Sequence, residues 1–72
     1  MNAAERDLLE AHARGDGRAV ARAYLAAANG AARAGDEGRA AFFLTHAWVF
    51  ALEAGDPLAG DCHERLSRMG RA

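Results

Sequence analysis

The sequence contains no lysine, isoleucine or glutamine, and all nine of its cationic side chains are arginine. Alanine is by contrast very common, with twenty of the 72 residues, and glycine accounts for a further eight. Alanine, glycine and arginine all have GC-rich codons. The bias therefore indicates a GC-rich, bacterial genome rather than a choice made for function.

Cysteine is almost absent, and long apolar runs are lacking. The single cysteine, Cys62, excludes a disulfide within the chain and fits a reducing compartment. No stretch approaches the roughly 20 apolar residues of a membrane-spanning helix. The charged start MNAAERD is unlike a signal peptide. We therefore expect a cytoplasmic protein that does not bind a membrane.

A strong excess of one charge is also lacking, and so are the motifs of catalysis. The net charge of -1 argues against a general nucleic-acid binder. Several glycines punctuate the chain but follow no strand, so a phosphate-binding loop is not indicated. Ser67, the sole serine, has no motif around it, which leaves a Ser-His-Asp arrangement unsupported. We expect no enzyme, no cofactor and no nucleic-acid partner.

What the sequence does contain is a repeated helix signal. The dipeptide Gly-Asp occurs at 15–16, 35–36 and 55–56, each time after a run with helical periodicity. Glycine just past a helix end and aspartate at the next start are typical stop and start signals. Pro57 fits the first position of a helix. We predict one all-α domain over residues 1–72, with four antiparallel helices joined by short Gly-Asp turns: roughly 3–14, 17–34, 37–54 and 57–69.

The third of these helices is apolar almost all the way round. We expect it to be the most buried element, with a set of its residues facing other helices: Phe43, Leu44, Ala47, Trp48, Phe50 and Ala51. Antiparallel pairing about residue 36 places Gly30 opposite Ala41 and Phe42, where it would make room for an aromatic ring. The alternative is that the second helix ends early at Asn29-Gly30.

Polar residues break this apolar surface at an interval of seven. Arg39, His46 and Glu53 line up along the helix, flanked by Phe42 and Val49. One interpretation is an exposed polar edge. The other is a recognition strip, in which apolar anchors lie beside a few directional groups. We predict that these five residues bind a protein or peptide partner, or a second copy in a homodimer. A catalytic His46 would lack both a nucleophile and a pocket.

A metal- or small-ligand-binding helical bundle is the alternative function. Cys62 and His63 are potential metal ligands within the segment DCHERL. Because adjacent helical residues point about 100° apart, a site would need a ligand from another helix, such as His46. Cys62 also lies on an apolar stripe, where a small buried thiol is the simpler interpretation.

The last half of the chain carries a family resemblance. Phe43, Ala47 and Phe50 match an aromatic-small-aromatic pattern, and Ala59 matches a later small position. This stretch resembles a tetratricopeptide repeat (TPR). His46 stands where leucine is usual, the terminal proline is missing, and the period is about 40 residues rather than about 34. The resemblance implies a TPR-like array of helical hairpins that binds proteins or peptides, with a groove lined by the first and third helices.

Overall fold

Four α-helices make up the chain in the computed structural model, which describes residues 3–72 apart from the side chains of Ala4 and Glu5. The helices are α1 (Ala3–Arg14), α2 (Gly17–Arg33), α3 (Glu37–Ala54) and α4 (Leu58–Arg68). The described range contains no strand. The predicted all-α class is therefore confirmed, and each helix begins and ends within one residue of its expected limits.

The turn between α2 and α3 shows how a glycine and an aspartate separate two helices. Gly35 has a φ of 78°, a conformation that is costly for residues with a Cβ. The next backbone N–H, of Asp36, donates to the carbonyl oxygen of Ala31 at 2.9 Å and closes α2. The Asp36 carboxylate then accepts the backbone N–H of Arg39 at 3.1 Å and begins α3. Asp16 caps α2 in the same way.

The turn between α3 and α4 differs, because its aspartate is buried. Asp56 is only 7% exposed. Its carboxylate accepts the backbone N–H of Leu58 at 2.9 Å and lies 3.3 Å from the guanidinium of Arg22 on α2. The N-cap position belongs to Pro57, and α4 begins at Leu58 rather than at Pro57 as expected. The ion pair between Asp56 and Arg22 thus distinguishes this turn from the other two, whose aspartates are exposed.

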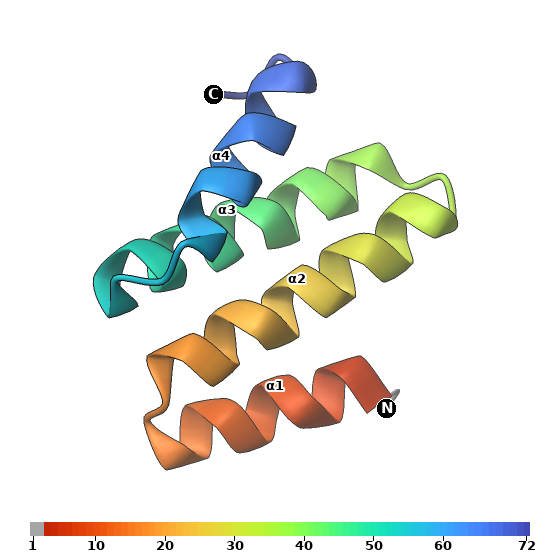
Figure 1. The fold of residues 1–72 in the computed structure, drawn as a ribbon. Coiled ribbons are helices and arrows are strands. Elements are labelled where there is room, and N and C mark those ends of the chain that lie inside the picture. The colour runs from red at the N-terminus through yellow and green to blue at the C-terminus, as the bar shows by residue number, and fades with distance from the viewer. Residues whose placement is uncertain (1–2) are drawn as a thin grey trace.

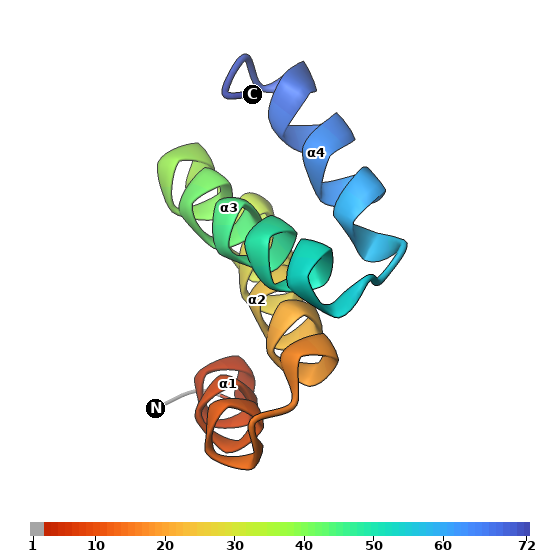
Figure 2. The same cartoon turned by 90° about the vertical axis from the view of Figure 1, so that its left-hand side faces the viewer.

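The helices form a flat array that measures 33 × 29 × 12 Å. Figure 1 shows α1, α2 and α3 side by side and running in alternating directions, with α4 slanting back across α3. In the rotated view, α1 and α3 lie on one side of the molecule and α2 and α4 on the other (Figure 2). Most contacts between helices therefore join chain neighbours.

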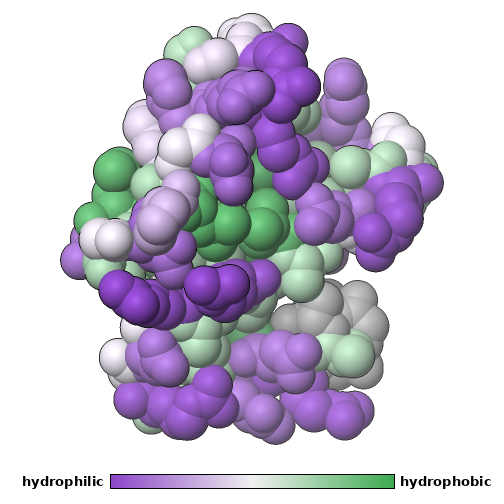
Figure 3. Space-filling model, viewed as in Figure 1, coloured by the Kyte–Doolittle hydropathy of each residue, from purple (hydrophilic) through white to green (hydrophobic). Residues whose placement is uncertain are grey.

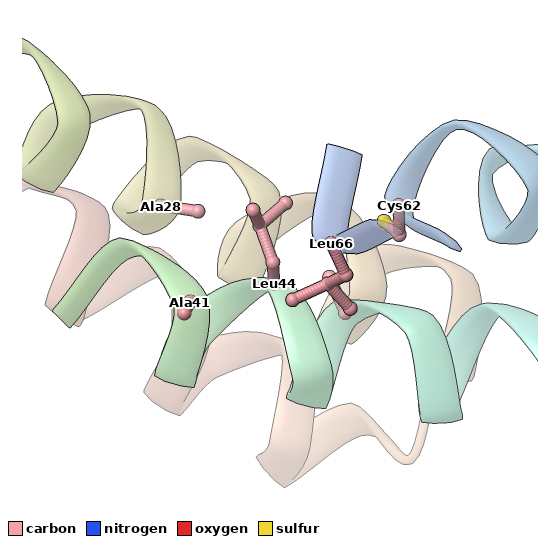
Figure 4. Packing of buried hydrophobic residues seen from close by; sticks show 6 residues of the cluster. Ala28, Ala41, Leu44, Cys62 and Leu66 are labelled. Atoms are coloured by element: carbon pink, nitrogen blue, oxygen red, sulfur yellow. The ribbon is translucent and has the colours of Figure 1, made fainter. Parts of the chain in front are cut away.

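The core lies where α2, α3 and α4 meet. Leu44, Cys62 and Leu66 are its largest fully buried side chains among the described residues, and Ala28 and Ala41 lie beside them (Figure 4). Figure 3 shows apolar side chains around this junction, bordered by polar ones. Because alanine presents one methyl group, helices can approach closely, but each alanine removes little apolar surface from water. The core is correspondingly thin.

The aromatic rings of α3 are less buried than expected. Leu44, Ala47 and Ala51 are fully buried. Phe43, Trp48 and Phe50 are half-buried and lie at the edges of the helix interfaces. Six residues of this helix were predicted to face other helices. The prediction is right for the two alanines and the leucine, whereas the three aromatic rings are only partly buried. The rings lie at the edges because a large ring in the centre of the interface would hold the alanine-lined helices α2 and α3 apart.

Gly30 does not have the role expected from the sequence. α2 continues without a break through Asn29 and Gly30 to Arg33, so the early helix end is wrong. A Cβ placed on Gly30 would meet nothing within 4 Å, so the residue does not make room for an aromatic ring either. Ala28 and Ala31 are the buried residues in this part of α2. Gly30 itself borders open space.

Candidate interaction surface

The five residues of the predicted strip lie together on one outward side of α3. Phe42 and Val49 are 57% and 44% exposed. Arg39 and Glu53 are exposed as well, and His46 is half-buried. The buried residues of this helix repeat at intervals of three and four on its opposite side. They are Ala40, Leu44, Ala47 and Ala51, and the fifth buried residue, Ala41, lies beside them.

Hydrogen-bond and ring contacts hold two polar members of this strip, His46 and Arg39, in place. The Nδ1 atom of His46 lies 2.9 Å from the carbonyl oxygen of Phe42. A carbonyl oxygen can only accept, so Nδ1 carries the hydrogen and donates it. The imidazole packs against the rings of Phe42 and Tyr24, at centroid distances of 4.4 and 5.0 Å. The guanidinium of Arg39 lies 5.3 Å from the ring centre of Phe43.

The exposed apolar surface extends beyond the predicted residues. Leu52, on the same outward side, is 56% exposed. Thr45 is also exposed, and its hydroxyl donates to the carbonyl oxygen of Ala41 at 2.9 Å, which satisfies its polar group. We call the row Phe42, Thr45, Val49 and Leu52 the outer seam. Its residues follow one another at intervals of three, four and three.

Sequence reasoning missed Leu52 and Thr45 for a physical reason. It found Phe42 and Val49 only as neighbours of the polar residues at intervals of seven, and a helix that is apolar almost all round has no periodicity to separate a buried side from an exposed one. The separation depends on where α2 and α4 pack against α3.

A second aromatic group surrounds Tyr24 of α2 and was not expected as a group. The Tyr24 ring stacks on Phe50 at 5.7 Å, with an interplanar angle of 17°, and contacts Phe43 at 6.3 Å. His12 of α1 meets Tyr24 and Phe50 edge-on, at 6.0 and 5.5 Å. These rings tie α1, α2 and α3 together.

The three candidate ligands of the alternative metal or ligand site are not brought together. His46 packs against Tyr24, and the His63 ring packs on Trp48 at 5.2 Å. Cys62 is fully buried in the core. The three predicted ligands therefore lie in different surroundings. Among the side chains that the structure describes, no three of His, Cys, Asp or Glu are placed to hold a metal ion together.

The chemistry of the Cys62 thiol follows from its burial. Burial raises the pKa of the thiol above its ordinary value, because removal from water disfavours the charged thiolate. The positive charge of Arg65 opposes this rise, and the negative charge of Asp61 adds to it. Since the thiolate is the reactive form of cysteine, Cys62 is a core residue rather than a nucleophile.

Two further observations concern the similarity of the chain to known proteins and its ability to cross a membrane. Comparison with protein-family models, with curated proteins and with solved structures finds no match. Among the helices that the structure describes, none has the length and apolar character needed to cross a membrane.

Proposed function

We propose that this chain is a small TPR-like protein–protein interaction module that binds its partner through the outward side of α3. The partner is a protein or peptide, or a second copy, and the module performs no chemistry of its own. One observation carries this proposal. Among the described residues, three of the four most exposed large hydrophobic side chains belong to the outer seam: Phe42, Val49 and Leu52.

Exposed apolar groups that gather on one surface are typical of interaction sites, whereas scattered ones need no explanation. Arg39, His46 and Glu53 border the seam, and such polar groups commonly set orientation and specificity at an interface. The alternating helix directions, with α1 and α3 on one side, support the TPR-like interpretation. The lone, buried Cys62 supports a cytoplasmic location.

A paired-variant binding experiment tests this function. Phe42→Asp combined with Val49→Asp places two charges on the exposed seam and should leave the helical content unchanged. Leu9→Asp is the matched control, since Leu9 lies on α1 and is 55% exposed. Each purified protein is immobilised and exposed to an extract of the native host, and the bound proteins are quantified by mass spectrometry.

The wild type and Leu9→Asp should retain the same partner, which can include the chain itself, and the double variant should lose it. Identical retention by all three proteins would contradict the proposal. A double variant that unfolds, seen by circular dichroism, would place Phe42 and Val49 in the core instead.

A further inference from the structure

We infer that the partner of the outer seam is the same seam on a second copy, packed antiparallel so that Arg39 of each copy lies opposite Glu53 of the other. This inference rests on the proposed function, because it assumes that the outward side of α3 is an interaction surface. It goes further by naming the occupant, the helix direction and the register.

The first argument is the spacing of the seam. Its residues follow one another at intervals of three, four and three, which is the spacing that lets two helices interlock side chains along a common seam. In an antiparallel pair the order of the second helix is reversed. Phe42 then meets the partner's Leu52, and Thr45 meets the partner's Val49. Each of these two pairs brings apolar groups of the two copies together. A two-fold axis between the helices generates each pair twice.

The second argument is the order of charges beside the seam. Arg39, His46 and Glu53 are spaced by seven residues on one flank, with the histidine at the midpoint. Reversal of the second helix places Arg39 opposite the partner's Glu53, twice in each dimer, and brings the two His46 rings near the axis. In a parallel two-fold pair this flank would instead face the partner's other flank, which carries Ala41 and Trp48, so neither charge would meet its opposite. The charges therefore favour the antiparallel direction.

The third argument is that both charges stand at the end of α3 that disfavours them. Arg39 lies in the first turn, beside the positive end of the helix dipole, and Glu53 lies in the last turn, beside the negative end. In an antiparallel pair, the N-terminus of one helix lies next to the C-terminus of its partner. Each charge then lies beside the opposite end of the neighbouring helix, which removes this conflict.

The surface is open to such a partner. Figure 2 shows α2 and α4 on one side of α3 and its other side turned outward. The Thr45 hydroxyl is already bonded to Ala41, so burial of the seam would leave it with a partner. A chain of this size with an alanine-rich core also gains stability from association, because the dimer buries surface that one copy exposes.

Sedimentation equilibrium over a range of protein concentrations measures the dimer. The wild type should show a concentration-dependent dimer. Leu52→Glu should raise the dissociation constant roughly thirtyfold or more, because it removes two apolar contacts from each dimer. Leu9→Glu, altered at a site of equal exposure on α1, should sediment like the wild type.

Charge exchange then tests direction and register. Arg39→Glu and Glu53→Arg should each weaken the dimer about tenfold or more, since each replaces two attractive pairs by two repulsive ones. The combined Arg39→Glu, Glu53→Arg variant restores opposite charges in the antiparallel register and should recover the wild-type dissociation constant. Both substitutions agree with the helix dipole, so loss of the fold is not expected, and circular dichroism verifies it.

A wild type that stays monomeric at several hundred micromolar would overturn the inference. So would a dimer that ignores Leu52→Glu, or one that the combined charge exchange fails to restore. These results differ from a failure of the proposed function. A monomer that still retains another protein through Phe42 and Val49 would keep the interaction module and remove only the second copy as its partner.

Discussion

At the scale of single residues, only a few of the fully buried side chains of this protein are larger than alanine. Leu44, Leu66 and Cys62 are the largest side chains that are fully buried among the described residues, and most of the remaining core is alanine. A buried thiol packs like a small apolar group, but unlike leucine it can ionise. Cys62 therefore makes the stability of the core depend on pH.

We predict that stability falls in alkaline solution because of Cys62. Burial raises the thiol pKa in the folded state, so on raising the pH the unfolded chain loses this proton first. The contribution of the thiol is thus complete below the unfolded pKa of about 8.5 and is lost as the pH rises through the folded value. Urea unfolding between pH 7 and 10 measures this fall in the free energy of unfolding.

Cys62→Ala provides the comparison. Loss of the buried sulfur should lower stability at every pH, but the variant should lack the part of the alkaline fall that comes from the thiol. Parallel pH profiles for the two proteins would assign the fall to other groups.

At the scale of helices, glycines act according to their backbone conformation. Gly35 has a positive φ and ends α2, whereas Gly30 lies inside α2 in helical conformation with open space beside it. A glycine inside a helix costs up to about 1 kcal/mol relative to alanine, and nothing in the packing around Gly30 compensates for it.

Gly30→Ala should therefore stabilise the protein, by up to about 1 kcal/mol. Gly35→Ala should destabilise it by about 1–2 kcal/mol, because alanine is strained in the left-handed conformation. Chemical denaturation of the two variants beside the wild type measures both changes. Destabilisation by Gly30→Ala would show that the space beside this glycine is needed.

At the scale of the whole molecule, the four helices are unequally attached. Each of α2 and α3 contributes five buried residues, whereas Ala11 is the buried residue of the described part of α1. Beyond this alanine, α1 is held by the half-buried Leu8 and by the contacts of His12 with Tyr24 and Phe50. Elements with few buried contacts open more easily than the core.

Native-state hydrogen exchange should follow this order. The backbone amides of α1 should exchange fastest, and those in the middle of α3, around Leu44 and Ala47, should exchange slowest. Nuclear magnetic resonance at 25 °C and neutral pH resolves the individual amides. Equal protection of α1 and α3 would mean that the array opens only as a single unit.

The sequence by itself determined the helices and their limits, because the signals that begin and end a helix are local. A glycine that reaches positive φ and an aspartate that caps the next turn act within a few residues of each other, as Gly35 and Asp36 do. Where the local rule failed, at Asp56 and Pro57, a contact with Arg22 on a distant part of the chain had intervened.

Only the tertiary structure decided which side of α3 is buried. The strip from Arg39 to Glu53 was visible as a seven-residue interval, but Leu52 was indistinguishable in the sequence from the core residue Leu44. The alanines of α2 and α3 let the two helices approach so closely that only small side chains and one leucine fit between them. The large rings consequently lie at the edges, around Tyr24, and the remaining apolar side chains form the outer seam.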